Sequence, residues 1–422
     1  MKTIVSITPL KVQEDSRTFK IAASFARFGY RSIVVEGAAS DLNRSELPFE
    51  LISIEANKTK ANVSTAPNKS TSTAHGLLKQ IYDRLPNFLK HLCLSLHYQA
   101  DYIYYVFGLF YLQGIRPLRY IPRASLYYLH SSYEYPAVFI KCKRHLVPFV
   151  YDAHDFYQGM EILDNKTYYE NLVDRILTPV ERQCSKHAAA VVTVGDGIAR
   201  LHKGLFNTAP VVIRNCHDYR LDRKPTVNLR QSLSLSSGDF LLVSVGQAKP
   251  GMGVEELLSA MQKLPANVHV ALVGKNTNQY SEFIQSPELM GRVHLVPPVM
   301  PFEVVPFIES ADAALIIYYS RAPNYYNCLP NGFFQAIGAG LPLLYPELPE
   351  IEKIAKQYNL GIPIDTRNPE SIKDGVLQMI SNTEKLSEYR GNALVARVEL
   401  SWEREENILR ELIYNILEKS NT

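Results

Sequence analysis

Short apolar runs alternate with longer segments of helical periodicity through most of this 422-residue chain. Thr3–Ile7 is a candidate strand, Phe19–Phe28 carries apolar residues at helical spacing, and Ser32–Val35 is a second candidate strand. A helix between two strands favours a parallel sheet, because parallel strands need crossover connections and are covered on both faces. Further strands of this sheet are predicted at Leu126–Leu129, Phe149–Tyr151, Ala190–Val194 and Val211–Ile213.

The same alternation starts again after a break at residues 218–239. Phe240–Val245 predicts a strand and Val254–Lys263 a helix, and more strands are predicted at Val268–Val273, Arg292–Val296, Ala313–Ile317 and Pro342–Leu344. The predicted fold class is therefore α/β, with two doubly wound domains at residues 1–220 and 221–400 and a terminal segment at 401–422. Open α/β sheets bind ligands at the carboxyl ends of their strands, so we expect the site in the cleft between the domains.

Charge balance and cysteine content narrow the classes of function. Lys and Arg number 45 and Asp and Glu number 42, which is too close to balance for a dedicated nucleic-acid binder. The five cysteines are scattered and form no CxxC pair, so we expect a reducing, cytoplasmic environment and no zinc ribbon. The first apolar run is too short for a signal peptide, and no uncharged apolar run reaches the roughly 18 residues of a membrane-spanning helix.

Two segments of the first half depart from the alternating pattern. Asn57–Ala74 is rich in Lys, Asn, Ser and Thr and predicts a mobile surface loop. Leu85–Arg123 is dense in Tyr, Phe and Leu, and basic residues continue to Arg144. This composition is typical of a surface that contacts anionic lipid, which would place the protein on the inner face of the membrane. A buried helix with solvated basic ends is the alternative.

A turn between a strand and a helix is the first candidate site. Residues 243–253 read Val-Ser-Val-Gly-Gln-Ala-Lys-Pro-Gly-Met-Gly. The backbone N–H groups of such a turn and the positive end of the helix suit an anion such as a diphosphate, and Lys249 adds a positive charge. A plain turn is the alternative, because glycines fit any tight connection and the full GxGxxG spacing is missing.

The turn Pro330-Asn331-Gly332 before the apolar helix Phe333–Ala339 is the second candidate. Residues 327–331 then lie at a helix N-terminus, which suits phosphate or sugar oxygens. The amide of Gln335, one turn further on, suits the hydroxyls of a ribose. The alternative is a loop in which Asn and Pro serve the turn geometry and Gln335 faces the core.

Two more candidates follow strands of the first domain. The strand Phe149–Tyr151 runs into Asp-Ala-His-Asp, where His154 suits a sugar hydroxyl or a developing charge, although a strand-end histidine is often structural. Asp15, Ser16 and Arg17 follow the first strand and face the same cleft. Capping of the first helix by Asp15 or Ser16 is the alternative.

The order of these segments resembles the GT-B glycosyltransferases, most closely the retaining, nucleotide-sugar-dependent glycosyltransferase family 4 of bacterial surface polysaccharide synthesis. The resemblance implies two Rossmann-like domains facing across a cleft, and a C-terminal helix, opened by Ser401-Trp402-Glu403, that crosses back to the first domain. It extends over nearly the whole chain and rests on residues 15–33, 151–155, 190–198, 212–215, 246–258 and 329–342.

The resemblance also implies an activity and a set of site residues. The expected reaction is retaining transfer of a sugar from a nucleotide-diphosphate sugar, UDP- or GDP-linked, to a polysaccharide or lipid-linked saccharide, without a metal or other cofactor. The expected catalytic residues are His154, Asp155 and Lys249. The expected acceptor-binding residues are Asp15, Arg17 and His130. The expected donor-binding residues are Gly246, Gln247, Lys249, Gly253, Gly274, Asn276, Tyr326, Asn327, Cys328, Leu329, Asn331 and Gln335.

Several positions that carry charge in the family are neutral in this chain. Gln247 stands where the family usually has an arginine, and Met252 stands where it has a lysine or arginine. Asn327 and Gln335 stand in place of the family's two glutamates, which are eight residues apart. Gly332 replaces a lysine that is frequent in the family. A charge-assisted hydrogen bond contributes about 1.5–3 kcal/mol, so these changes bear on activity. A catalytically inactive, glycosyltransferase-like partner or scaffold in a polysaccharide assembly complex is therefore the alternative function.

Overall fold

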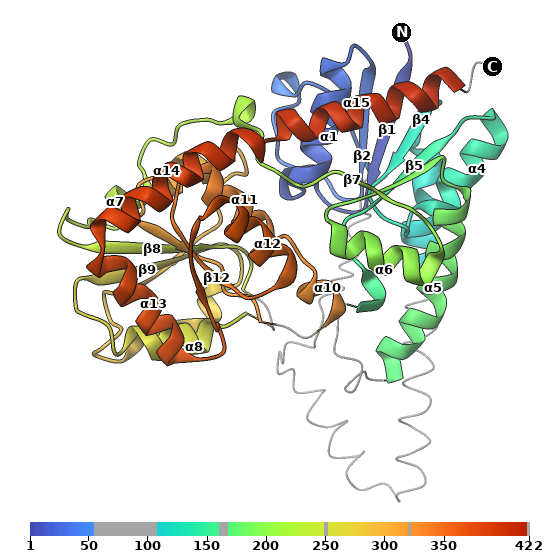
Figure 1. The fold of residues 1–422 in the computed structure, drawn as a ribbon. Coiled ribbons are helices and arrows are strands. Elements are labelled where there is room, and N and C mark those ends of the chain that lie inside the picture. Colours follow the sequence, from blue (N-terminus) through green and yellow to red (C-terminus); the bar gives the residue numbers. More distant parts are fainter. Residues whose placement is uncertain (55–107, 160–167, 249–251, 320–321, 420–422) are drawn as a thin grey trace, which may run out of the picture.

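The computed structural model describes residues 1–54, 108–159, 168–248, 252–319 and 322–419. In these residues the chain forms two α/β domains that lie side by side, and the last helix, α15 (Trp402–Lys419), lies along the first domain (Figure 1). The predicted stretches 57–74 and 85–107 fall outside the described residues.

The first domain is built on a seven-stranded parallel sheet with the strand order β3-β2-β1-β4-β5-β6-β7. Its strands are β1 (Thr3–Thr8), β2 (Arg31–Glu36), β3 (Glu50–Ser53), β4 (Leu126–Leu129), β5 (Phe149–Ala153), β6 (Ala190–Thr193) and β7 (Val211–Val212). The order reverses between β1 and β4, so the loops after these two strands diverge and leave room for a ligand at the carboxyl edge.

Helices cover both faces of this sheet, and alternate residues of each strand face opposite layers. Val5 and Ile7 of β1 pack with the layer of α4 and α5, whereas Ile4 packs with α1 and α15. The helices of this domain are α1 (Ser16–Arg27), α4 (Tyr135–His145), α5 (Tyr168–His187) and α6 (Asp196–Phe206). Short helical turns occur at η1 (Val12–Glu14), η2 (Arg44–Glu46), η3 (Gly108–Ile115), η4 (Arg116–Arg119) and η5 (Tyr157–Gly159).

The second domain is built on a six-stranded parallel sheet with the order β10-β9-β8-β11-β12-β13. Its strands are β8 (Phe240–Val245), β9 (Val268–Val273), β10 (Val293–Val296), β11 (Ala313–Leu315), β12 (Leu343–Pro346) and β13 (Gly361–Ile364). Its helices are α7 (Leu229–Ser232), α8 (Val254–Met261), α9 (Val304–Ile308), α10 (Pro323–Tyr326), α11 (Asn331–Gly338), α12 (Pro349–Tyr358), α13 (Pro369–Ser381) and α14 (Thr383–Glu399). Helical turns occur at η7 (Tyr219–Leu221), η8 (Thr277–Tyr280) and η9 (Phe283–Gln285).

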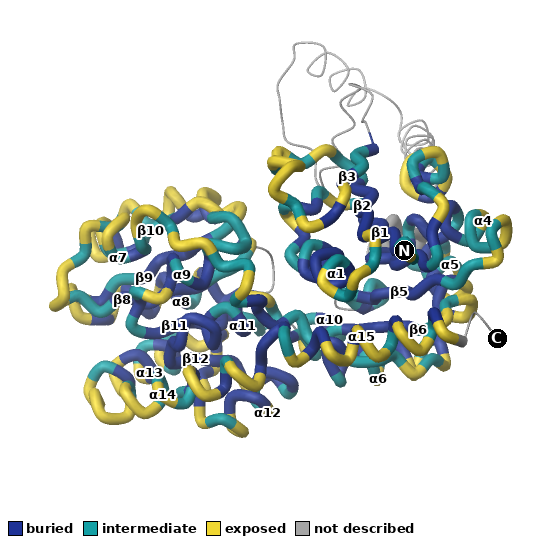
Figure 2. Tube along the Cα trace, turned by 90° about the horizontal axis from the view of Figure 1, so that it is seen from above, coloured by how far each residue is buried: buried dark blue, intermediate teal, exposed yellow. Residues whose placement is uncertain are grey.

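Two apolar layers sandwich the second sheet, with α8 and α13 on one face and α9, α11, α12 and α14 on the other. In Figure 2 the strands of both domains are buried and the outward faces of the surrounding helices are exposed. The carboxyl ends of both sheets therefore remain as the places where polar loops gather.

The C-terminal helix α15 ties the two domains together. Trp402 is fully buried, its indole N–H donates to Ser24 Oγ at 2.9 Å, and its backbone N–H donates to the His217 carbonyl at 2.9 Å. Leu409 and Ile413 continue the contact in the same apolar layer as α1. The prediction of a terminal helix that crosses back to the first domain is confirmed.

The predicted fold class is also confirmed, with two doubly wound parallel sheets. The predicted strands Leu126–Leu129, Phe240–Val245 and Val268–Val273 have the observed bounds. The edge strands β3 and β13 were not predicted from the sequence. The predicted domain boundary at residue 220 falls in the connection between β7 and β8. Among the described residues, no helix combines the length and the apolar character needed to cross a bilayer.

Candidate active site

A buried ion pair holds the strand ends of the first domain. The guanidinium of Arg17 donates to both carboxylate oxygens of Asp152 at 2.9 Å and to the Ile213 carbonyl at 2.8 Å. The Tyr128 hydroxyl donates to Asp152 at 3.0 Å. Burial acts to raise the pKa of Asp152, but the charges of Arg17 and His154 outweigh it and the pKa is lowered. Asp152 therefore stays ionised, and Arg17 is a structural cation.

Asp15 serves as the N-cap of α1. Its carboxylate accepts from the Thr18 backbone N–H at 3.0 Å and from the hydroxyls of Thr8 and Thr18. Arg17 and Asp15 are only 2% and 7% exposed. The capping alternative therefore describes Asp15 better than direct contact with an acceptor, and the guanidinium of Arg17 is committed to internal partners.

Two histidines lie against this ion pair. His130 Nδ1 and His154 Nε2 are 3.1 Å apart, and His154 Nε2 lies 3.6 Å from Asp152. Burial and the neighbouring His154 lower the pKa of His130 to about 3, so His130 is neutral. Burial acts to lower the pKa of His154, but the charge of Asp152 raises it above its ordinary value. With its side chain 20% exposed, His154 is the histidine of this cluster that reaches the surface.

Among the described residues, His130, Asp152 and His154 form the one group of potential metal ligands. Their ligand atoms all lie within 4.8 Å of one another. Both oxygens of Asp152 already accept hydrogen bonds from Arg17. A divalent cation here would sit beside a buried guanidinium and compete for those oxygens. The set fits a hydrogen-bonded chain that orients His154 better than a metal centre.

The expected diphosphate turn of the second domain is shaped by close backbone contacts. A Cβ atom on Gly274 would lie 1.9 Å from the Gly246 carbonyl oxygen, and one on Gly253 would lie 2.3 Å from that of Thr366. Gly246 and Gly274 have φ values of 151° and 155°, which favour glycine. Gln247 is exposed beside this turn. Lys249 lies outside the described residues.

The first turn of α11 meets this turn directly. A Cβ atom on Gly332 would lie 2.4 Å from the carbonyl oxygen of Val245, at the end of β8. A glycine therefore allows the start of α11 to approach the strand end. The first turn of α11 therefore lies beside the end of β8. The N–H groups of Gly246 and Ala248 donate to the carbonyls of Val273 and Lys275, so the first turn of α11 is the better place for an anion.

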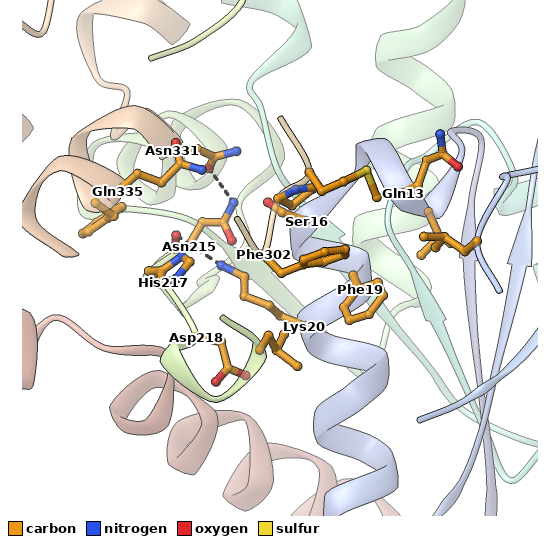
Figure 3. Close-up of a pocket in the computed structure, with 16 residues that line it drawn as sticks. Gln13, Ser16, Phe19, Lys20, Asn215, His217, Asp218, Phe302, Asn331 and Gln335 are labelled. Carbon is orange, nitrogen blue, oxygen red and sulfur yellow. Dashed lines mark hydrogen bonds between the residues drawn. The ribbon is translucent and has the colours of Figure 1, made fainter. Parts of the chain in front are cut away.

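Asn331 and Gln335 of α11 line a pocket between the two domains (Figure 3). Gln13, Ser16, Phe19 and Lys20 of the first domain line the same pocket. Met300, Pro301 and Phe302 and the linker residues Asn215, His217, Asp218 and Leu221 complete most of the remaining wall. The pocket therefore has apolar walls and a few convergent amides and hydroxyls, as small-molecule sites usually have.

The pocket and the histidine cluster meet at the first turn of α1. Ser16 lines the pocket, and the preceding Asp15 lies within electrostatic range of His130 and His154. Across the domains, Asn215 donates to Asn331 at 2.6 Å, and Lys275 pairs with Glu14 at 2.6 Å. The two halves of the site are thus held against each other.

Four predicted residues before α11 form or border the domain contact. The side chain of Asn327 donates to the Pro323 carbonyl at 2.8 Å and packs against Gly197, and Leu329 is buried against Gly195. Tyr326 is 48% exposed, and Cys328 is half-buried. Among the predicted donor residues that the structure describes, only Asn331 and Gln335 therefore reach the pocket wall.

Asp155 and Asn276 complete the predicted set. Asp155 accepts from the amide of Asn324 at 3.0 Å, and the same Asn324 accepts from the backbone N–H of Phe156 at 2.8 Å. Asp155 therefore contributes to the contact between domains. Asn276 is exposed in a left-handed conformation with φ of 61°, at the start of η8.

Lys20 is a pocket residue that the sequence analysis missed. Its ammonium donates to the carbonyls of Asn215 and Cys216 and lies 5.0 Å from the ring centre of Trp402. Burial lowers its pKa to about 7. The hydrophobic periodicity predicts that Lys20 lies on a helix, but it does not predict a place in the pocket. The partners of Lys20 come from the linker and from α15, which are distant in the sequence.

Two facing Rossmann-like domains, a pocket between them and a returning C-terminal helix are the features of the GT-B fold. Residues 226–394 match the family model described as glycosyl transferases group 1. Residues 226–394 therefore form a glycosyl transferases group 1 domain, and the whole chain has the GT-B fold.

An uncharacterized glycosyltransferase of Methanocaldococcus jannaschii is 22% identical to the chain over 204 residues. The match covers 46% of this chain and about half (51%) of that curated relative.

Solved structures match nearly the whole chain. Sucrose-phosphate synthase from Thermosynechococcus elongatus superposes with a TM-score of 0.69 at 13% identity, covering 99% of this chain and 100% of the other. Anabaena HepE in complex with UDP-glucose gives 0.67 at 14% identity, with 98% and 100% covered. WaaG, a glycosyltransferase involved in lipopolysaccharide biosynthesis, gives 0.63 at 17% identity, with 97% and 99% covered. At these identities the likeness establishes the fold.

Proposed function

We propose that the protein transfers a sugar from a nucleotide-diphosphate sugar to a saccharide acceptor with retention at the anomeric carbon. The observation that carries this proposal is the pocket between the domains, which Asn331 and Gln335 line together with Gln13 and Ser16. A site that needs both domains suits a reaction between two substrates, because domain closure brings them together and excludes water. The complex of the structural neighbour HepE with UDP-glucose supports the choice of donor.

The donor is proposed to lie along α11. The amides of Asn331 and Gln335 suit the hydroxyls of a ribose, and the apolar wall with Phe302 suits a base. The diphosphate is assigned to the start of α11, where Gly332 approaches the end of β8. Charge develops on the leaving diphosphate as the glycosidic bond breaks, and fixed amide dipoles stabilise it there. This arrangement needs no metal, and we propose that none takes part.

His154 is proposed to orient the donor sugar from the first domain. Asp152 and the neutral His130 fix its ring, and the raised pKa favours a cationic imidazole that donates hydrogen bonds to sugar or phosphate oxygens. Asp155 contributes indirectly, because it holds the segment that leads into α11.

The acceptor is proposed to be a growing polysaccharide or a lipid-linked saccharide in the cytoplasm. The involvement of the structural neighbour WaaG in lipopolysaccharide biosynthesis supports this class of acceptor. Acceptor binding by Asp15, Arg17 and His130 would be indirect, because their side chains are at most 7% exposed.

The test is a transfer assay with UDP-, GDP- and CMP-linked sugars, followed by NMR of the product. We expect one donor to be consumed and the new glycosidic bond to keep the anomeric configuration of the donor. Inversion of that configuration would contradict the retaining mechanism. If the folded protein neither transfers nor hydrolyses any of these donors, the proposed enzymatic activity is contradicted.

A second candidate function is an inactive partner in polysaccharide assembly. The neutral side chains of Gln247 and Gln335, where the family carries charge, favour it. The double variant Gln247→Arg and Gln335→Glu separates the two functions. An enzyme adapted to neutral residues loses activity in this variant, whereas an inactive partner stays inert or gains nucleotide-sugar binding.

A further inference from the structure

A second pocket lies where α14 of the second domain leads into α15, which runs along the first domain (Figure 1). Among the described residues, none that lines it also lines the pocket between the domains. Its volume is about 560 Å³, and small-molecule sites usually occupy roughly 300–1,000 Å³. We call it the junction pocket and define it by its polar lining residues Tyr219, Arg397, Ser401, Glu403, Arg404 and Asn407.

Two arginines give the junction pocket positive charge. The guanidinium carbon of Arg397 lies 4.5 Å from the ring centre of Tyr219, in a cation–π contact. In the part of the chain that the structure describes, neither Arg397 nor Arg404 forms an ion pair with a carboxylate, whereas the nearby Arg220 pairs with three. A guanidinium carries five N–H donors in a planar fork that matches a phosphate group. The two arginines therefore suit a phosphate.

A carboxylate in the same wall narrows the class of ligand. Oε1 of Glu403 lies 3.4 Å from Nε of Arg220, whereas Oε2 is buried and accepts no hydrogen bond from the described residues. A buried acceptor without a donor is costly, so a ligand that donates a hydroxyl hydrogen to it is favoured. A phosphate beside this carboxylate would be repelled, whereas hydroxyl groups at a distance from the phosphate would not. The wall therefore suits a molecule with a phosphate at one end and hydroxyls at the other.

We propose that the junction pocket binds a phosphorylated sugar, with its phosphate held by Arg397 and Arg404. The sugar hydroxyls are assigned to Oε2 of Glu403 and to the amide of Asn407, which can both donate and accept. Such a ligand bridges α14 and α15, the two helices that connect the domains. This inference goes beyond the transfer reaction and does not depend on it.

The two pockets are neighbours, so a test must distinguish them. The ring centres of Tyr219 in the junction pocket and His217 in the pocket between the domains are 5.1 Å apart. A sugar phosphate also resembles part of a nucleotide-sugar donor. Binding must therefore be assigned by variants in each pocket, and not by affinity alone.

The experiment is calorimetric titration of the full chain with glucose 1-phosphate and glucose 6-phosphate, and with glucose and inorganic phosphate as partial ligands. We expect a sugar phosphate to bind with a stoichiometry of one. Each partial ligand should bind at least roughly tenfold more weakly, because it makes only some of the contacts. Arg404→Gln should weaken sugar-phosphate binding by roughly tenfold or more, because a charge-assisted hydrogen bond is lost. Arg404 is exposed, so this variant should keep the melting temperature of the unliganded protein.

Arg410→Gln is the matched control, because Arg410 is an exposed arginine of the same helix that lies against Phe28, outside the junction pocket. It should bind the sugar phosphate like the unaltered protein. Ser16→Tyr, which fills the pocket between the domains, should also leave this binding unchanged. A ligand that Ser16→Tyr excludes lies in the pocket between the domains, and the proposal is then overturned.

Three further results overturn the proposal. The first is that neither sugar phosphate binds, and the second is that inorganic phosphate binds as tightly as the sugar phosphates, which makes the pocket a simple anion site. The third is that Arg404→Gln binds undiminished or that Arg410→Gln loses as much affinity. None of these results bears on the transfer assay with nucleotide sugars, so the two proposals fail separately.

Discussion

The two halves of the candidate site use opposite chemistry. In the first domain the ends of β1, β4 and β5 hold a buried network of full charges, centred on Arg17 and Asp152. In the second domain the pocket wall carries neutral amides, Asn331 and Gln335, and backbone N–H groups. The charged cluster is committed to internal partners. On the neutral wall Asn331 accepts from Asn215 at 2.6 Å, and we propose that the remaining hydrogen-bonding groups of this wall serve a ligand.

The largest expected effect comes from breaking the charged half. Asp152→Asn leaves the guanidinium of Arg17 buried without its counter-ion, so we expect a loss of about 3–5 kcal/mol in the free energy of unfolding. Urea denaturation of the full chain measures it. The control is Glu50→Gln in the exposed pair Arg31–Glu50, which should cost less than about 1 kcal/mol. Equal losses in the two variants would show that the buried ion pair contributes no more to the free energy of unfolding than the exposed pair.

A second buried carboxyl sharpens the contrast within the first domain. Among the described residues no cation pairs with Glu134, one of its oxygens has no hydrogen-bond partner, and burial raises its pKa to about 8. Its folded pKa lies above the unfolded value, so its contribution to stability is present below about pH 4.5 and is lost as the pH rises through 8.

The variant Glu134→Gln removes this titration. We therefore expect it to raise the melting temperature at about pH 8.5 relative to the unaltered protein by roughly 5 °C, with a smaller difference at about pH 5. Scanning calorimetry at the two pH values checks this. A difference that does not depend on pH would mean that Glu134 is ionised in the folded protein.

The neutral half should respond through binding and not through stability. Gln335→Ala removes one neutral hydrogen-bonding group from the pocket wall, so we expect nucleotide-sugar affinity to fall by roughly 3- to 10-fold at an unchanged melting temperature. The control Gln378→Ala, on the exposed side of α13, should change neither quantity. A drop in melting temperature with unchanged affinity would make Gln335 a structural residue.

The smallest effect is expected where the halves meet. The pair Glu14–Lys275 joins them, but its side chains are 42% and 46% exposed. Glu14→Gln should therefore lower the free energy of unfolding by less than about 1 kcal/mol, and by less still in high salt. Comparing melting curves at two salt concentrations checks this. A larger effect that does not depend on salt would mean that this contact holds the domains together.

The sequence predicted the parallel sheets because buried strands such as Leu126–Leu129 are continuous apolar runs. It missed β3 and β13, which are short edge strands with partly exposed residues. The sequence predicts a turn and a helix start at residues 330–335, and in the structure Asn331 and Gln335 line the pocket; their predicted donor-binding role stays a prediction. It assigned ligand roles to Arg17 and Asn327, since their partners Asp152 and Gly197 are distant in the sequence and no local pattern indicates them.

The most direct test of the account is calorimetric titration of the full chain with UDP-, GDP- and CMP-linked sugars. We predict that one nucleotide sugar binds with a stoichiometry of one. Filling the pocket from the first domain with Ser16→Tyr should weaken that binding, and so should Gln335→Ala from the second domain, whereas Gln378→Ala should leave it unchanged. A folded protein that binds none of these sugars, or binds one with an affinity indifferent to both Ser16→Tyr and Gln335→Ala, would contradict a donor site shared by the two domains.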